Sequence, residues 1–252
     1  MNPKYRFSTY LRHITTAIHT GGHGIHSPFL FDFIRNIVME KNPYYCFDEI
    51  EKQRKALANN RSRTHLPEAG AGTLATAART GLKRARLDQV LFRMCVRYKF
   101  NNVLEVGNSL GVTTLYLLAA GSKMNCVCAC NTLPEITSSQ PDISGRKNVR
   151  LETIASNADL AILLESVENP DLIVISGSSQ PEQIADYFGQ CVNFIHSNSI
   201  IVIDAPYRQA ETARVWTDIK HHPQVKASID LYHWGVVFFD PAFANRHYRV
   251  LF

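Results

Sequence analysis

The sequence predicts an α/β protein in which a mostly parallel sheet is covered by helices on both faces. From residue 102 onward, short apolar runs alternate with segments of helical periodicity, a pattern typical of parallel sheets. Near the end, Val225–Leu231 and Gly235–Phe239 are two further apolar runs joined by a short turn, which predicts an antiparallel hairpin. The region before residue 102 lacks this alternation and predicts an N-terminal helical extension.

The extension, residues 1–100, is predicted to be mainly helical. Tyr10, Ile14 and Ile18 share one face of an amphipathic first helix. Ser27-Pro28 is a helix start, because serine caps free amides and proline tolerates the first helical position. That helix is expected to reach about Met39, and a further apolar helix is expected over 87–98. Residues 60–77 are rich in small side chains and predict a loop, either a functional lid or a simple linker.

The α/β domain is expected to occupy residues 101–252. Its predicted strands are Val103–Val106, Asn125–Cys130, Val149–Ile154, Leu172–Ile175 and Ile200–Ile203, followed by the hairpin. Helices are expected near 110–120, 157–167, 181–196 and 209–221. In an open sheet of this kind, ligands bind outside the carboxyl ends of the strands, so the residues at those ends are the candidates for chemistry.

Composition narrows the function classes. The formal net charge is +5, but the basic residues are scattered among 22 acidic ones, which argues against nucleic acid as a partner. No apolar run is long enough to cross a bilayer and no signal peptide is recognisable, so we expect a cytoplasmic protein without a membrane partner. Cys126, Cys128 and Cys130 alternate on one predicted strand face, which favours packed small hydrophobes over a disulfide or a zinc site.

The segment Asn102–Leu118 organises the rest of the domain. An apolar strand ends at Glu105-Val106-Gly107, and helical spacing resumes after Gly111. Such a turn places free helix amides at the carboxyl edge of a strand. The residues argue against a phosphate-cradling P-loop, because Gly111 is followed by Val112 and Thr113 rather than by lysine and serine or threonine. A glycine turn with a purely structural role in some other α/β protein is the alternative.

The spacing of Glu105, Gly107 and Gly111 resembles the first motif of the class I S-adenosylmethionine (SAM) dependent methyltransferases. The resemblance implies a Rossmann-like class I methyltransferase fold, with a mostly parallel seven-stranded sheet and a C-terminal antiparallel hairpin. It also implies SAM as cofactor, with the glycine turn lining its methionine end. The string HGIHSPF, residues 23–29, is similar to the N-terminal signature of O-methyltransferase-like proteins of the Bacteroidetes type. A metal site at His19, His23 and His26 is disfavoured, since no carboxylate or cysteine accompanies them.

The candidate cofactor-binding residues lie at the carboxyl ends of successive strands. They are Glu105, Gly107, Asn108, Ser109, Gly111, Asn131, Ser156 and Ser176. Asn131 stands where an acidic residue would accept hydrogen bonds from the ribose hydroxyls. Its side-chain carbonyl can still accept a hydrogen bond, but without the negative charge. Ser156 is placed near the adenine by the resemblance, but it can equally cap the helix that follows, which is the favoured single role.

The fourth and fifth strands end in residues that do not suit a metal. The metal-dependent O-methyltransferases that share this fold carry carboxylates at both ends, whereas here Ser176 and Asp204-Ala205 occupy those positions. A single carboxylate is a poor ligand set for a hard cation, so no metal is predicted. Asp204 and Tyr207 are the candidate catalytic residues, which would position the acceptor. A role of Asp204 in organising the turn before Pro206 is an equal alternative.

Two functions follow from these residues. The first is a SAM-dependent methyltransferase that acts on a small-molecule substrate without a metal, since methyl transfer needs mainly alignment. The second is a non-catalytic relative that serves as a ligand-binding or interaction module, because Asn131, Ser176 and Ala205 are all neutral. A third hypothesis, an enzyme that uses NAD, is supported only by the analogy of its fold. The exposed edge of the hairpin would allow a homodimer.

Overall fold

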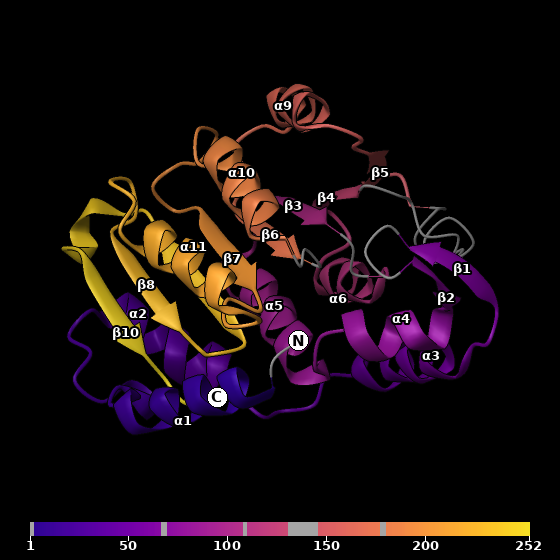
Figure 1. Ribbon diagram of the computed structural model, residues 1–252. Helices are drawn as coiled ribbons and strands as arrows, with labels where there is room; N and C mark the ends of the chain where they lie inside the picture. Colours follow the sequence, from indigo (N-terminus) through magenta and orange to yellow (C-terminus); the bar gives the residue numbers. More distant parts are fainter. Residues whose placement is uncertain (1–2, 67–69, 108–109, 131–145, 177–179) are drawn as a thin grey trace. The chain divides into compact units, whose positions relative to one another are not determined.

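The computed structural model describes the whole chain except residues 1–2, 67–69, 108–109, 131–145 and 177–179 (Figure 1). The described residues form an α/β structure, and strands β3 to β10 belong to one mostly parallel sheet. The predicted fold class is therefore confirmed, with eight strands in this sheet where seven were expected. The chain divides into two compact units, residues 1–41, 169–175 and 179–252, and residues 42–168 and 176–178.

The first unit contains the N-terminal helices and the last two helices of the chain. Its helical elements are α1 (Pro3–Thr16), η1 (Thr20–Gly22), α2 (Pro28–Phe33), the π-helical turn η2 (Ile34–Val38), α10 (Pro181–Cys191), α11 (Ala210–Lys220) and η3 (Pro241–Phe243). The Ser27 hydroxyl accepts from Leu30 N and Pro28 opens α2, as the sequence predicted. The helix expected to reach Met39 is one α-helical and one π-helical turn in succession.

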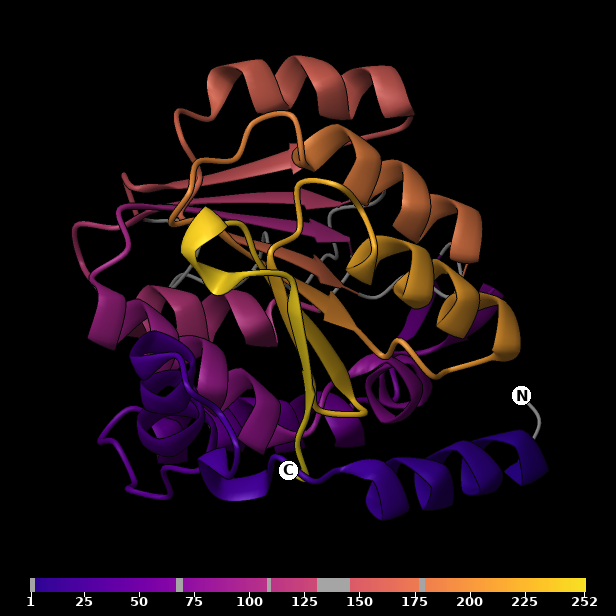
Figure 2. The same cartoon turned by 90° about the vertical axis from the view of Figure 1, so that its left-hand side faces the viewer.

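The strands of the first unit run in the order β10, β8, β9, β7, β6. Their bounds are β6 (Leu172–Ser176), β7 (Ile200–Asp204), β8 (Ala227–Asp230), β9 (Trp234–Phe238) and β10 (Arg246–Arg249). The predicted hairpin is confirmed, because β8 and β9 pair antiparallel. Strand β10 was missed by the sequence reasoning: it is a short edge strand, Arg-His-Tyr-Arg, with no apolar alternation, and it pairs parallel to β8 (Figure 2).

Two tryptophans fill the core of the first unit. Trp216 and Trp234 are almost completely buried. A Cβ atom added at Gly235 would lie 2.5 Å from the Trp216 ring, so the strand carries glycine where the indole lies against it. The hairpin turn is tight, with Tyr232 at a φ of 64° and its backbone N–H donated to Asp230 Oδ1.

A buried polar cluster joins α1 to the end of β8 within the first unit. The Asp230 carboxylate accepts from the Tyr207 hydroxyl and, at 3.4 Å, from Trp216 Nε1. His13 of α1 places its Nδ1 atom 3.6 Å from Asp230 Oδ1 and its Nε2 atom 3.1 Å from the Val250 carbonyl. Burial lowers the pKa of His13, and this outweighs the opposite effect of Asp230. The cluster therefore favours neutral His13.

The lowered pKa of His13 predicts a loss of stability in acid. The unfolded chain, with an ordinary histidine pKa, binds a proton more readily than the folded state as the pH falls through about 6.5. The free energy of unfolding should therefore decrease below that pH, and His19 and His247, whose pKa values burial also lowers, act in the same direction. Urea unfolding of the wild type and of His13→Gln over about pH 5.5 to 7.5 measures this. An identical pH slope in the two proteins would contradict the role of His13.

The second unit begins with helices and a small hairpin. Its elements are α3 (Phe47–Asn59), β1 (Arg63–Leu66), β2 (Gly70–Thr73), α4 (Leu74–Gly81), α5 (Ala85–Tyr98), β3 (Asn102–Gly107), α6 (Val112–Ala120), β4 (Asn125–Cys130), β5 (Val149–Thr153) and α9 (Asn157–Ser166). Strands β3, β4 and β5 pair in parallel in that order. β1 and β2 form a separate antiparallel pair, so the loop predicted over 60–77 was wrong in that part.

The three alternating cysteines of β4 lie where the sequence predicted. Cys126, Cys128 and Cys130 are buried, with exposed fractions of 1%, 6% and 6%, and all carry free thiols. Burial raises the pKa of Cys130 to about 12, so its thiol is protonated at neutral pH. The predicted packing of these side chains in a buried strand is thus confirmed. No helix in the described part of the chain is long and apolar enough to cross a membrane.

Candidate functional site

The glycine turn after β3 is the centre of the candidate site in the second unit. Gly107 ends β3 with a φ of 108°, and a Cβ atom there would lie only 1.7 Å from the carbonyl oxygen of Ser176. Any other residue would collide with the backbone at the end of β6. Gly111, with a φ of 79°, is the N-cap of α6 and supplies no capping side chain. The predicted residues Asn108 and Ser109 lie outside the described residues, as does Asn131.

The uncapped start of α6 is the chemically notable part of this turn. The first N–H groups of a helix have no intrahelical acceptor and carry the positive end of the helix dipole. In most helices a serine, threonine or aspartate side chain satisfies one of them. Gly111 has no side chain that could do so, and the positive end of the α6 dipole suits a negatively charged group.

Glu105, the acidic residue of the motif, is buried inside the second unit. Its Oε2 atom accepts from the Thr114 hydroxyl at 2.8 Å, and the Cys128 thiol lies 3.9 Å from the same oxygen. Only 2% of its surface is exposed. The carboxylate therefore links β3 to α6 and to β4, which fixes the helix that follows the glycine turn. Its predicted contact with a cofactor stays a prediction.

Ser156 has the capping role that the sequence favoured. Its hydroxyl accepts from Asp159 N, while the Asp159 carboxylate accepts from Ser156 N at 2.8 Å and from Ala155 N at 2.9 Å. The Ser156 side chain, and after it the backbone N–H groups of Ala155 and Ser156, lower the pKa of Asp159 by hydrogen bonding to its carboxylate. The reciprocal pair satisfies backbone donors at the start of α9, whereas the N-cap of α6 is a glycine without a capping side chain.

Sequence reasoning missed the most buried basic group near the turn. Lys83 lies in the connection between α4 and α5, and its Nζ atom donates to the Thr113 hydroxyl at 2.9 Å and to the Ser176 hydroxyl at 2.8 Å. No basic residue follows β6 closely in the sequence. The tertiary fold supplies one from a position 93 residues earlier in the chain. Nothing in the local sequence, Gly-Leu-Lys-Arg, indicates this placement.

A buried ion pair between Arg54 and Asp88 lies next to Lys83. Arg54 of α3 donates to Asp88 Oδ2 at 2.6 Å and to the Lys83 carbonyl at 2.5 Å, and its Nε atom donates to Glu51 at 2.8 Å. Thr113 donates its hydroxyl proton to Asp88 Oδ1 at 2.8 Å. Burial alone would lower the pKa of Arg54, but Asp88 and Glu51 outweigh it and raise the pKa. The cluster thereby holds α3, α5 and α6 in one arrangement.

The two candidate catalytic residues belong to the first unit, where both already have partners. Asp204 ends β7 and its Oδ1 atom accepts from Trp234 Nε1 at 3.2 Å. The Tyr207 hydroxyl donates to Asp230, and burial together with the Asp230 charge raises the pKa of Tyr207. The turn between them is organised by backbone hydrogen bonds, Ala205 N to His233 O and Arg208 N to Ala205 O. Tyr207 is thus a protonated donor at neutral pH.

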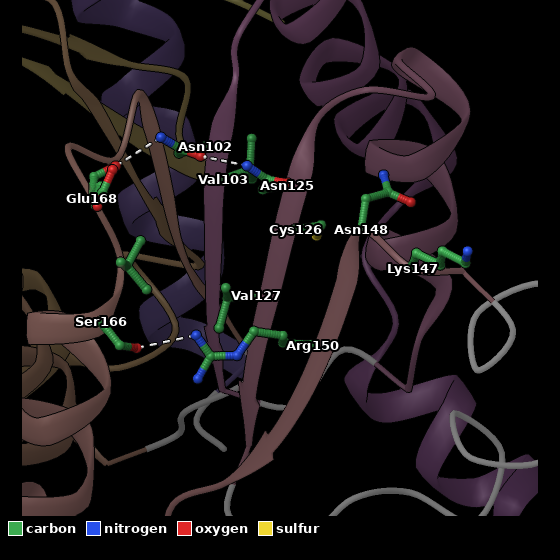
Figure 3. A pocket seen from close by; sticks show the side chains of 11 residues that line it. Asn102, Val103, Asn125, Cys126, Val127, Lys147, Asn148, Arg150, Ser166 and Glu168 are labelled. Atoms are coloured by element: carbon green, nitrogen blue, oxygen red, sulfur yellow. Dashed lines mark hydrogen bonds between the residues drawn. The ribbon is translucent and has the colours of Figure 1, made fainter.

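A hollow lies at the edge of the second unit's strands opposite the glycine turn (Figure 3). It encloses about 240 Å³ where β3, β4 and β5 begin, lined by Asn102, Asn125, Asn148, Lys147 and Arg150 among others. Its amides largely bond to neighbouring groups: Asn102 Nδ2 donates to the Glu168 carbonyl at 2.7 Å, and Asn125 Nδ2 donates to Asn102 Oδ1 at 3.0 Å. These bonds tie strand starts to the α9–β6 connection, a structural role distinct from the glycine turn.

The described residues show no protein-based metal centre. Among them, no group of three or more histidine, cysteine, aspartate or glutamate side chains is arranged to hold a metal ion. His19, one of the three N-terminal histidines, instead accepts from Arg249 N at 3.4 Å and packs edge-on against Tyr248.

The parallel sheet, the terminal hairpin and the glycine turn together define the fold of the class I methyltransferases, and solved structures share it. A methyltransferase from Podospora anserina with bound S-adenosylhomocysteine (SAH) aligns with 85% of this chain and 97% of its own, at a TM-score of 0.58 and 11% identity. An O-methyltransferase from Bacillus cereus in complex with SAH aligns with 83% of this chain and 97% of its own, at a TM-score of 0.51 and 16% identity.

A third solved structure is the O-methyltransferase TomG from Streptomyces achromogenes, involved in tomaymycin synthesis and in complex with SAM. It covers 80% of this chain and 92% of its own, with a TM-score of 0.55 and 11% identity. No protein-family model and no curated protein sequence matches the chain. At such low identities the likeness shows the fold, and it agrees with the fold that the resemblance implied.

Proposed function

We propose that this protein is a SAM-dependent methyltransferase that acts on a small-molecule acceptor without a metal ion. The observation that carries the proposal is the uncapped amino-terminal turn of α6, which follows a glycine turn at the carboxyl end of β3. Three neighbours with this fold were crystallised with SAM or SAH, which supports the same cofactor here. Bound SAM would supply an electrophilic methyl group on its sulfonium.

Residues at the glycine turn and at neighbouring strand ends would hold the cofactor. Gly107 lets the backbone turn sharply against Ser176, and Gly111 offers no side chain to cap the first amides of α6. Glu105 fixes α6 through Thr114. Asn131 stays our candidate for the ribose hydroxyls. Asp204 and Tyr207 stay candidates for positioning the acceptor. Membership of the narrower group, the O-methyltransferase-like proteins of the Bacteroidetes type, stays a prediction from the string HGIHSPF.

The charge at the end of β6 supports a reaction without metal. Ser176 offers a neutral hydroxyl there, and the Lys83 ammonium group lies 2.8 Å from it. A divalent cation placed beside this ammonium would be repelled at short range and in a poorly solvated place. Alignment of the methyl donor and the acceptor can by itself supply much of the rate enhancement of such a transfer.

Calorimetric titration with SAM and with SAH tests the proposed function. We expect micromolar binding of both ligands, with dissociation constants that are the same in magnesium chloride and in EDTA. Binding that requires magnesium would contradict only the metal independence and would leave the proposed methyltransferase activity in place. No detectable heat at millimolar ligand would refute the proposed methyltransferase and leave the non-catalytic module.

A further inference from the structure

Helix α1, which lies beside the end of the chain in Figure 2, contacts the rest of its unit through a polar face. Tyr5, Thr9 and His13 recur at intervals of four residues and therefore share one side of the helix. The Tyr5 hydroxyl donates to the Gln209 carbonyl at 3.2 Å, and His13 Nε2 lies 3.1 Å from the Val250 carbonyl oxygen. The Thr9 hydroxyl lies 3.2 Å from a tyrosine hydroxyl of the hairpin turn. These three residues form the inner face of α1.

The apolar side chains of α1 point away from the inner face. At about 3.6 residues per turn, Phe7, Leu11 and Ile14 lie on the opposite side of the helix. They are 70%, 51% and 41% exposed, and Ile18, just after the helix, is 68% exposed. An amphipathic helix ordinarily buries its apolar stripe against its own fold, and α1 does the reverse. These four residues form the outer face of α1, a contiguous apolar surface of the kind that marks an interaction site.

The charges around the outer face indicate the kind of partner that covers it. Lys4, Arg6 and Arg12 are exposed residues of α1, and the sequence contains no acidic residue before position 32. Two acidic groups of the same unit, Asp230 and Glu211, interact electrostatically with inner-face residues instead. An apolar face that carries phenylalanine and leucine, on a helix whose charges are all basic, is typical of helices that lie in the surface of an anionic membrane.

A second copy of the chain is a poorer match for the outer face. Packing two such helices together would bring the basic residues of both copies close to one another, and the helix has no acidic residue to pair with them. An anionic lipid surface attracts each of them.

A helix that lies in the bilayer surface needs no segment long enough to cross it, which is compatible with the helix lengths in the described part of the chain. The expectation of no membrane partner rested on the lengths of the apolar runs and on the lack of a signal peptide, neither of which a surface helix requires.

We propose that the outer face of α1 binds the surface of an anionic phospholipid membrane. Its apolar side chains enter the boundary between headgroups and acyl chains, while Arg12 reaches the lipid phosphates. The inner-face contacts hold the rest of the first unit on the aqueous side of the helix. This inference goes beyond the proposed methyltransferase activity and does not depend on it.

Cosedimentation of the full chain with lipid vesicles tests the proposal. We expect the wild type to bind vesicles that contain phosphatidylglycerol and to stay in the supernatant with phosphatidylcholine alone. Leu11→Ser should lower the partition coefficient about 10-fold, because the membrane takes up this side chain. Arg12→Gln should lower it about fivefold through the lost attraction to anionic lipid. Ile162→Ser and Lys123→Gln change exposed residues of the second unit, and these matched controls should bind like the wild type.

Fluorescence shows whether the outer face itself enters the lipid. Phe7→Trp places an indole on that face, and brominated lipid in anionic vesicles should quench its emission. Ile162→Trp, at an equally exposed position of α9, is the control and should show no more quenching than the wild type. Trp216 and Trp234 are buried and give the same background in each protein.

The proposal is overturned if the wild type stays in the supernatant with anionic vesicles, or if Leu11→Ser binds them as well as the wild type does. Sedimentation velocity without lipid tests the second copy as the partner. A wild-type dimer that Leu11→Ser converts to a monomer would assign the outer face to self-association instead. Thermal unfolding shows that each variant is folded, which we expect because the substituted side chains are exposed.

Discussion

Replacing Gly107 by alanine is expected to destabilise the protein by about 4 kcal/mol or to prevent folding, because two penalties coincide. The added Cβ atom would lie 1.7 Å from the Ser176 carbonyl oxygen, and the backbone φ of 108° is one that residues with side chains rarely adopt. Neither partner can yield cheaply, since both belong to backbone at strand ends. Urea unfolding monitored by circular dichroism measures the change in the free energy of unfolding.

Gly189→Ala is the matched control for Gly107→Ala. Gly189 lies within α10, and an added Cβ atom there would meet no heavy atom within 4 Å. Alanine is the better helix former, so this variant should be more stable by about 0.5–1 kcal/mol. If Gly107→Ala unfolded at the same urea concentration as the wild type, the close approach of Ser176 would not exist in solution.

Replacing Asp88 by asparagine is expected to cost about 3–5 kcal/mol, the loss typical of breaking a buried ion pair from one side. Asp88 is 1% exposed and is the shared acceptor of Arg54 and Thr113. Without its charge, Arg54 keeps Glu51 as its remaining carboxylate partner, and the Thr113 hydroxyl loses a charged acceptor. Chemical unfolding gives the size of the loss.

A double-mutant cycle shows whether the loss comes from the pair itself. Asp88→Leu combined with Arg54→Met should be less destabilised than the sum of the two single variants, by about 1 kcal/mol or more. Lys52→Met on the same helix removes an exposed ion pair with Glu49 and should change stability by less than about 0.5 kcal/mol. Strict additivity of the Asp88 and Arg54 variants would mean that the pair does not couple α3 to α5.

Much of the fold could be predicted because its signals are local. The strands at 103–106, 125–130 and 200–203 are apolar runs bounded by turns, and the helix that starts at Pro28 carries its own capping residue. The hairpin of β8 and β9 was readable because two apolar runs lie three residues apart. The strands that sequence reasoning missed also have a local explanation. Their sequences carry no apolar alternation, because pairing with a neighbouring strand rather than burial defines them. They are Arg63–Leu66, Gly70–Thr73 and Arg246–Arg249.

The sequence by itself determined the parallel sheet, the glycine turn and the neutral Ser176 at the end of β6, because periodicity and strand-end position are properties of contiguous residues. Only the tertiary structure decided why Gly107 must be glycine, namely the Ser176 carbonyl against it. It also decided that Glu105 bonds Thr114, and that Lys83 meets Ser176 and Thr113. These contacts join segments far apart in the chain, and a long flexible side chain such as lysine leaves no local trace of where its charge will lie.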